Sequence, residues 1–279
     1  MEVTSLSDAP SATALFSAAA RAAHCLVDDP PQVIIDHDAV ELCSVFTPSP
    51  VEFHLSFPAE PVLVAARGSA VLRAAFARQL LAANRTAQLV LLGAGLDTFV
   101  AAEFSGPVWL VDRPAVLAWR HQVCTQAGVA DIGTPVPFAL PDAGLLPALV
   151  DAGWDPTAPT AVIALGLSMY LTEEQNRALL ASLVLPPGSL LLMDVLLPDI
   201  AADAAGRDYA AAICARAGNS EPWLSRFTPA GLAELLVDCG WTLRESRPEA
   251  EQVPALFWQR QSHLRPMRLV ELVAAVPRS

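Results

Sequence analysis

Apolar residues gather in short runs that are separated by stretches with helical spacing. Runs of strand length begin near Gln88, Val108, Pro135, Thr160 and Ser189, and two more cover residues 241–245 and 268–276. Such runs, alternating with helices, are typical of a doubly wound α/β fold with a mainly parallel sheet. The pattern therefore predicts seven strands, of which the last two form an antiparallel hairpin.

The residues ahead of the first strand have a helical pattern. An Ala-rich helix is expected over 11–27, the mixed stretch 32–58 is broken by prolines, and a long helix over 61–83 leads into the first strand. We therefore expect residues 1–60 to form an N-terminal helical lid. Residues 61–279 are expected to form the α/β domain, with a helical insert at about 199–227 after the fifth strand, the whole being one structural unit.

Charge and composition restrict the partners. The net charge is −12, which disfavours binding to nucleic acid or to an anionic membrane. All 17 basic residues are arginine, so Schiff-base chemistry and a P-loop lysine are excluded. No apolar run approaches the roughly 20 residues that span a bilayer, and no secretion signal is visible, so we expect a cytoplasmic protein.

The cysteines and histidines show no metal pattern. The five cysteines are scattered without C-x-x-C spacing, and the five histidines are equally dispersed. We expect no metal and no disulfide framework.

A glycine turn follows the first predicted strand, in the stretch Leu92-Gly93-Ala94-Gly95-Leu96-Asp97-Thr98, and the second strand ends on Asp112. A buried strand, a glycine turn and a second strand ending in an acid are typical of a nucleoside site. The third glycine of a dinucleotide fingerprint is missing, because Thr98 stands there. The pattern therefore favours a ligand with a ribose diol and no pyrophosphate, such as S-adenosylmethionine (SAM).

Further motifs lie along the chain, and together with the glycine turn they are Ala66-Arg67, Gly93-Ala94-Gly95-Leu96-Asp97-Thr98, Val111-Asp112-Arg113-Pro114, Gly153-Trp154-Asp155-Pro156 and Gly166-Leu167-Ser168-Met169-Tyr170-Leu171. These motifs resemble the leucine carboxyl methyltransferase-like branch of class I SAM-dependent methyltransferases. The resemblance extends over nearly the whole chain. It implies a Rossmann-like methyltransferase fold with SAM as cofactor.

The resemblance also implies roles for individual residues. Arg67 would hold the SAM carboxylate, Asp112 the ribose, and the remaining cofactor-lining residues would be Gly93, Ala94, Gly95, Leu140 and Leu165. Arg67 could alternatively be a surface helix arginine. Asp97 could cap the helix after the turn, and Tyr170 could line the substrate pocket or belong to the core.

Four positions depart from the family pattern. Leu110, Ala139 and Leu165 stand where the family commonly has a carboxylate, and Phe99 stands where it often has arginine. The loss of a buried charge-assisted hydrogen bond typically costs about 1.5–3 kcal/mol. The departures therefore leave two states of the cofactor open: bound and reactive, or lost or non-reactive.

Two enzyme functions are compatible with these residues, and no catalytic residue is identified. The first is methyl transfer from SAM to a carboxylate or hydroxyl oxygen of a small molecule of secondary metabolism. The lid and the insert would enclose the acceptor, with substrate-binding candidates Tyr170, Arg207, Tyr209, Arg216 and Trp223.

Arg207 and Arg216 could clamp an anionic substrate, or could be solvated residues that balance Asp203 and Asp208. The second function is a SAM-independent cyclisation or rearrangement of an apolar substrate on the same fold. A non-catalytic binding protein is a third reading, which no feature favours.

Overall fold

The computed structural model describes residues 10–98, 100, 104–217 and 222–278. All seven strands lie in one sheet, in the order β3-β2-β1-β4-β5-β7-β6. Their bounds are β1 Gln88–Leu92, β2 Val108–Asp112, β3 Thr134–Pro137, β4 Thr160–Ala164, β5 Leu190–Leu196, β6 Trp241–Pro248 and β7 Val270–Pro277. The strands β1 to β5 pair in parallel, whereas β7 is antiparallel to both β5 and β6. The predicted seven-stranded, mainly parallel fold is confirmed.

The strand order reverses between β1 and β4. The chain runs outward from β1 through β2 to β3, and then returns to the other side of β1 with β4. In open α/β sheets, a crevice forms outside the carboxyl ends of the strands at such a switch point. Because the glycine turn follows β1, it lies at this crevice.

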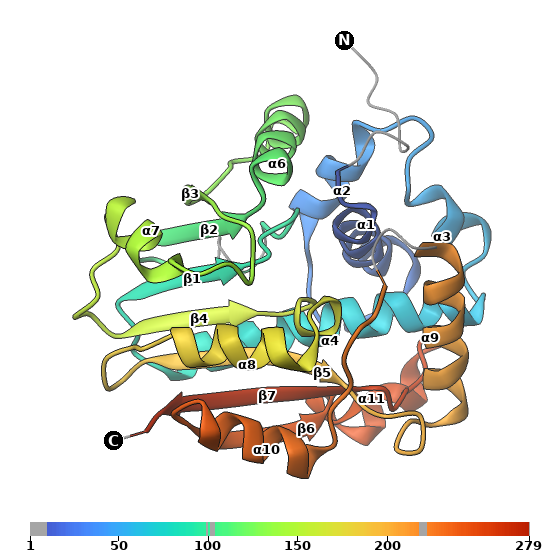
Figure 1. Ribbon diagram of the computed structural model, residues 1–279. Helices are drawn as coiled ribbons and strands as arrows, with labels where there is room; N and C mark the ends of the chain where they lie inside the picture. Colours follow the sequence, from blue (N-terminus) through green and yellow to red (C-terminus); the bar gives the residue numbers. More distant parts are fainter. Residues whose placement is uncertain (1–9, 99, 101–103, 218–221, 279) are drawn as a thin grey trace.

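Helices cover both faces of the sheet (Figure 1). Their bounds are α1 Ala12–Val27, α2 His37–Ser44, α3 Glu52–Ser56, α4 Pro61–Ala83, α6 Pro114–Ala127, α7 Leu145–Asp151, α8 Glu173–Ser182, α9 Ala204–Ala217, α10 Pro229–Asp238 and α11 Ala255–Arg260, with the short 3-10 helices η2 Ser168–Tyr170 and η3 Glu249–Gln252. One core cluster joins α4 to alternate residues of the strands, such as Leu91 and Ile163. A second cluster, on the other face, joins α7, α8 and α10 to the intervening strand residues, such as Val90 and Val162. This alternation is the period-two pattern of a strand buried on both faces.

The helices α1, α2 and α3 lie beyond the carboxyl ends of the parallel strands (Figure 1). A third core cluster is shared by α1, α2 and α6, and it includes Leu96 of the glycine turn. The N-terminal helices therefore pack directly on the turn. No helix among the described residues is long and apolar enough to cross a membrane.

The two helices predicted over 11–27 and 61–83 are confirmed as α1 and α4. A capping box of Thr172 and Gln175 starts α8. The third strand, expected to begin near Pro135, is short and spans Thr134–Pro137. Its two prolines offer no N–H for a ladder, which an edge strand tolerates. A turn then ends the strand, with the N–H of Asp142 donating to the carbonyl of Ala139 at 2.9 Å.

Candidate functional site

The glycine turn depends on backbone conformations that favour glycine. Gly93 has φ +69° and Gly95 has φ +46°. A Cβ atom on Gly95 would lie 3.0 Å from the Cβ of Ala14 in α1. Both the left-handed conformation and the close approach of α1 therefore require a residue without a side chain at Gly95.

Two buried arginines hold the carbonyl groups of this turn. Arg120 of α6 donates to the carbonyl oxygens of Gly95 and Asp97 at 3.1 and 2.9 Å. Arg21 of α1 donates to the carbonyl of Leu96 at 2.9 Å and pairs with Asp36, the residue that caps α2. The turn is thus fixed from α6 on one side and from α1 on the other.

Asp112 ends β2 next to the turn. Its two carboxylate oxygens accept the backbone N–H groups of Gly95 and Arg113, at 2.9 and 2.8 Å. Burial raises the pKa of Asp112 above its ordinary value, against the opposing effect of these two hydrogen bonds. The carboxylate is therefore oriented by the backbone while its remaining lone pairs stay available for a ligand. Asp97 accepts from the N–H of Val100 at 3.1 Å, the geometry of a helix cap.

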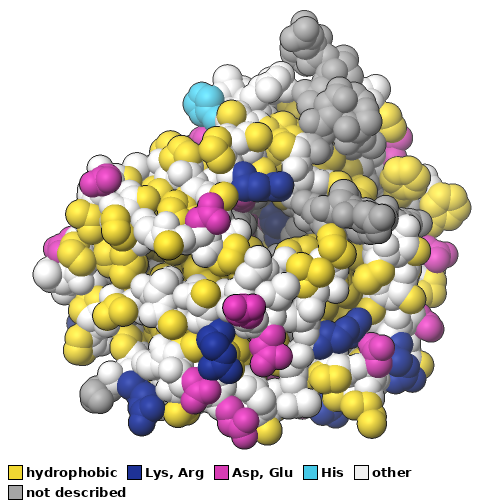
Figure 2. All heavy atoms as spheres, in the orientation of Figure 1, with side chains coloured by type: hydrophobic (Ala, Val, Ile, Leu, Met, Phe, Trp, Pro, Cys, Tyr) yellow, Lys and Arg dark blue, Asp and Glu magenta, His cyan; other side chains and the backbone are white. Residues whose placement is uncertain are grey.

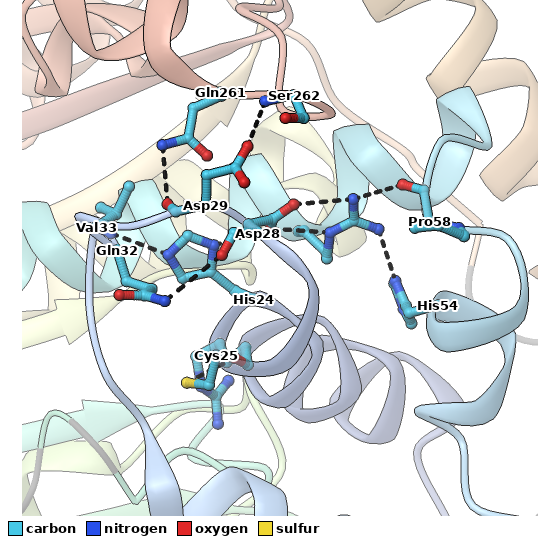
Figure 3. A network of polar contacts seen from close by, with 12 residues as sticks. His24, Cys25, Asp28, Asp29, Gln32, Val33, His54, Pro58, Gln261 and Ser262 are labelled. Atoms are coloured by element: carbon cyan, nitrogen blue, oxygen red, sulfur yellow. Dashed lines mark hydrogen bonds and ion pairs between the residues drawn. The ribbon is translucent and has the colours of Figure 1, made fainter.

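Arg67 is fully buried in a polar network between the N-terminal helices and α4 (Figure 3). Its Nε and Nη2 donate to the two carboxylate oxygens of Asp28 at 2.9 and 3.1 Å. Nη2 also donates to the carbonyl of Pro58, and Nη1 to Nδ1 of His54. Burial, followed by the positive charge of Arg67, lowers the pKa of His54 to about 4, so this imidazole is neutral and accepts.

His24 completes this network, because its Nε2 accepts the N–H of Val33 and its Nδ1 therefore carries the proton that it donates to Asp28. The segment after α11 joins the same loop. The N–H of Ser262 donates to the carboxylate of Asp29, and the side-chain amide of Gln261 donates to the carbonyl of Asp29 (Figure 3). Arg67 thus ties α4 to the N-terminal helices, and its charge is balanced by Asp28.

The apolar departures lie in different environments. Leu110 is buried in the core and packs against Gly133. A Cβ atom added to Gly133 would lie 2.8 Å from the Leu110 side chain. Leu165 is half-buried against the first core cluster, whereas Ala139 is exposed after β3. Its neighbour Leu140, which is not a departure, is half-buried against the second core cluster. Phe99 lies outside the described residues.

Aromatic side chains from three segments meet beyond the carboxyl ends of β4 and β5. Tyr209 of α9 and Trp223 have ring centroids 6.3 Å apart. The N–H of Leu224 donates to the carbonyl of Met169, which brings this loop onto η2 next to Tyr170. Tyr170, Tyr209 and Trp223 all pack against the same core cluster. Three of the five substrate candidates therefore lie in one region.

The other two candidates are both arginines of α9. Arg207 is exposed, and its Nη1 donates to the backbone carbonyl of Ala202. Arg216 falls in α9, but its side chain lies outside the described part.

Arg73 supplies a cation that sequence reasoning did not find. It projects from α4 to the carboxyl ends of β4 and β5, where its Nη1 lies 3.1 Å from a carboxylate oxygen of the fully buried Asp194. The other oxygen of Asp194 accepts the N–H of Gly166 at 2.6 Å. Asp194 is the one charged residue within β5, whose sequence is LLLMDVL. A buried acid of this kind requires a partner, and the search for it could have led to Arg73.

The space-filling view in Figure 2 shows a hollow between α6 and α1, with basic side chains at its mouth. Since the chain has no lysine, these are arginines. The turn, Asp112 and the aromatic region all belong to the carboxyl edge of the sheet. The edge thus combines a carboxylate at β2 with a cation at β5.

The comparisons with known proteins agree with this geometry. The family model of leucine carboxyl methyltransferase matches residues 14–184, more than half of the chain. A Mycolicibacterium gilvum protein, provisionally named an S-adenosyl-L-methionine-dependent methyltransferase, is 40% identical over 141 residues, which are 47% of this chain and 52% of that protein. A Bacillus subtilis protein with the same provisional description is 28% identical over 198 residues, 68% of this chain and 65% of that protein.

The chain thus spans between about half and two thirds of the length of these relatives, 52% and 65%. Among solved structures, a provisionally named methyltransferase from Thermobifida fusca has a TM-score of 0.58 at 18% identity, covering 93% of this chain and 94% of that one. An O-methyltransferase family protein from Burkholderia thailandensis has a TM-score of 0.52 at 15% identity, covering 80% and 62%. These two likenesses show the fold alone. On the sequence match over residues 14–184, the chain belongs to the leucine carboxyl methyltransferase family.

Proposed function

We propose that this protein transfers the methyl group of SAM to an oxygen atom of a small molecule. The observation that carries the proposal is the fixed glycine turn at the switch point, with Asp112 hydrogen-bonded to it. The names of the two relatives support SAM as the methyl donor. Membership of a methyltransferase family supports an enzyme.

The residues at the turn fit this cofactor at its ribose end. Asp112 offers two oriented oxygens that can accept from a ribose diol, and the N–H groups of a glycine turn can approach a ligand closely. We assign Gly93, Ala94 and Gly95 to the methionine part, with Leu140 and Leu165 as apolar contacts. Arg67 is assigned to the cofactor carboxylate by family likeness, but it reaches that group only if its pairing with Asp28 is loosened.

When bound, SAM supplies a methyl carbon on a positively charged sulfur. The chain's own contribution is to bring the acceptor oxygen into line with that carbon and to keep water out. The N-terminal helices and the aromatic region of Tyr209 and Trp223 would form this enclosure. An oxygen acceptor is favoured over an amine because Arg73 presents N–H donors, which an anionic oxygen accepts.

Isotope labelling tests the proposal. The protein is incubated with SAM that carries a deuterated methyl group and with a panel of phenols, enols and carboxylic acids, and the products are read by mass spectrometry. We expect at least one oxygen-methylated product that carries the label. SAM binding without any labelled product, across the panel and in a metabolite extract, would overturn methyl transfer as the function.

A second candidate function is a SAM-independent rearrangement of an apolar substrate. The buried pair of Arg67 and Asp28 favours it, because the cation expected to meet the cofactor is already neutralised. The apolar Leu140 and Leu165 would then line a substrate site. This candidate predicts that the folded protein binds neither SAM nor its product S-adenosylhomocysteine (SAH).

A further inference from the structure

A surface groove of about 510 Å³ lies between α4, the 3-10 helix η3 and the loop that joins α1 to α2. Small-molecule sites commonly have volumes of about 300–1,000 Å³. The groove is separate from the glycine turn, because its Arg78 lies further along α4 than Arg73, which reaches the carboxyl ends of β4 and β5. At the helical rise, the two arginines are about 7.5 Å apart along the axis. No residue that lines the groove has a role in the cofactor site or in the aromatic region.

One wall of the groove is a stripe along α4. Its members are Ala75, Arg78, Gln79 and Ala82, whose spacing of three and four positions places them on one face of the helix. Ala75 borders the core, whereas Gln79 and Ala82 are exposed. The stripe therefore presents two polar side chains between two small apolar ones.

The opposite wall comes from Gln252 and Val253, where η3 ends. The Nε2 of Gln252 donates to the Oε1 of Gln79 at 2.8 Å, and this hydrogen bond joins the two walls. It occupies the side-chain oxygen of Gln79, whose amide nitrogen carries two N–H groups. The amide of Gln79 can therefore act on a ligand as a donor.

One end of the groove is apolar. Val33 and Val253 line it, and both pack against the small core cluster that contains Phe257. The N–H of Val33 also donates to Nε2 of His24 at 2.9 Å, which fixes the loop that carries Val33 (Figure 3). This end is therefore a preformed surface for a hydrocarbon group.

The groove carries a positive charge on a protein whose net charge is −12. Among the described residues that line it, Arg78 is the charged one, and it is half-buried. A guanidinium has five N–H donors in a planar fork that matches the two oxygens of a carboxylate. One cation balances one negative charge, so a carboxylate suits the groove better than a phosphate group, which carries nearly two.

We propose that this groove binds a small amphipathic carboxylate, a medium-chain carboxylic acid in its ionised form, at a site separate from the cofactor and the methyl acceptor. The carboxylate accepts from Arg78 and from the amide of Gln79, and the hydrocarbon chain lies against Val33 and Val253. Removal of this chain from water contributes to the affinity. The ligand contacts the N-terminal segment through Val33 and the α/β domain through α4 and η3.

The test is a calorimetric titration with octanoate, into the wild type alone and into the wild type in the presence of excess SAH. Arg78→Gln removes the charge but keeps a polar side chain, and Ala82→Trp places a bulky ring in the groove from an exposed helix position. Arg85→Gln is the matched control, because Arg85 is exposed, follows α4 and does not line the groove. The comparison ligands 1-octanol and octyl phosphate have the same chain with a different head group.

We expect one octanoate to bind per chain, with the same affinity in the presence and absence of SAH. Arg78→Gln should bind octanoate at least about tenfold more weakly, since it loses a hydrogen bond between charged groups. Ala82→Trp should lose affinity to a similar degree, whereas Arg85→Gln should bind as the wild type does. Both 1-octanol and octyl phosphate should bind more weakly than octanoate.

No octanoate binding to the folded wild type, or equal affinity in Arg78→Gln, would overturn the site. Loss of octanoate binding in the presence of SAH would place the ligand in the cofactor region and would also overturn it. Binding of 1-octanol or octyl phosphate as tight as that of octanoate would overturn the assignment to a carboxylate. If Ala82→Trp does not fold, the contrast between Arg78→Gln and Arg85→Gln decides. Neither result depends on the proposed function, because no methyl transfer is measured.

Discussion

The guanidinium of Arg67 and the carboxylate of Asp28 form a two-point ion pair, with distances of 2.9 and 3.1 Å, and both side chains are fully buried. The pair joins α4 to the loop after α1, so it attaches the N-terminal helices to the α/β domain. The pair also engages the guanidinium of Arg67, which family likeness assigns to the carboxylate of the cofactor. The same contact therefore bears on stability and on ligand binding.

Asp28→Asn leaves Arg67 buried without its counter-charge. Removal of one partner from a buried pair typically costs about 3–5 kcal/mol, and we expect a loss of this order in the free energy of unfolding measured with urea. The control is Asp238→Asn, which breaks the exposed pair with Arg177 and should change the stability by less than about 1 kcal/mol. Equal effects of the two substitutions would contradict the structural role of Asp28.

Gly95→Ala tests the contact between the glycine turn and α1. Alanine at this position would have to adopt a left-handed backbone conformation. Its Cβ atom would also lie 3.0 Å from the Cβ of Ala14. Gly128→Ala is the matched control, because Gly128 has φ +68° but nothing within 4 Å of its Cβ position. The conformational cost of about 1–2 kcal/mol is common to both. We expect Gly95→Ala to lose more stability than this and to weaken SAH binding, whereas Gly128→Ala should bind SAH normally.

The buried acid at Glu249 makes stability depend on pH. The pKa of Glu249 is raised from 4.5 to about 8 in the folded protein. Between these values the unfolded chain releases the proton while the folded protein keeps it, so the stability of the wild type falls as pH rises. The slope from this group is at most about 1.4 kcal/mol per pH unit, and it ends above pH 8.

Glu249→Gln removes this titration, so its melting temperature relative to the wild type should increase from pH 5 to pH 8 and then level off. Glu174→Gln, at an exposed position of α8, is the control and should follow the wild type. A constant difference between Glu249→Gln and the wild type across this range would show that Glu249 is ionised in the folded protein.

The alternation of apolar runs predicted the sheet well, because strands buried on both faces have little freedom in composition. The runs at Gln88 and Val108 begin the strands β1 and β2, and the glycine turn follows β1. The segment between the last two strands was less accessible to prediction. Its elements η3 and α11 are short, and their residues show no clear period.

The polar contacts of the site could be predicted only in part. Asp112 was identified because a strand-terminal acid after a glycine turn has a local signature. Arg73 was not, because it and its partner Asp194 lie far apart in sequence and meet only in the folded protein. Arg67 was identified by likeness, but its pairing with Asp28 depends on the fold of the N-terminal loop. Local motifs therefore predicted where the cofactor binds, whereas the side-chain partners of these residues depend on long-range packing.

The most direct test is a calorimetric titration of SAH into the wild type and into Asp112→Asn, with Asp151→Asn at an exposed position of α7 as the control. Loss of a hydrogen bond to a charged group costs about 1.5–3 kcal/mol, so the variant should bind SAH at least about tenfold more weakly. The account predicts binding of one SAH per chain to the wild type, and a loss in Asp112→Asn that Asp151→Asn does not share. No heat of binding in the folded wild type, or equal affinity in Asp112→Asn, would contradict it.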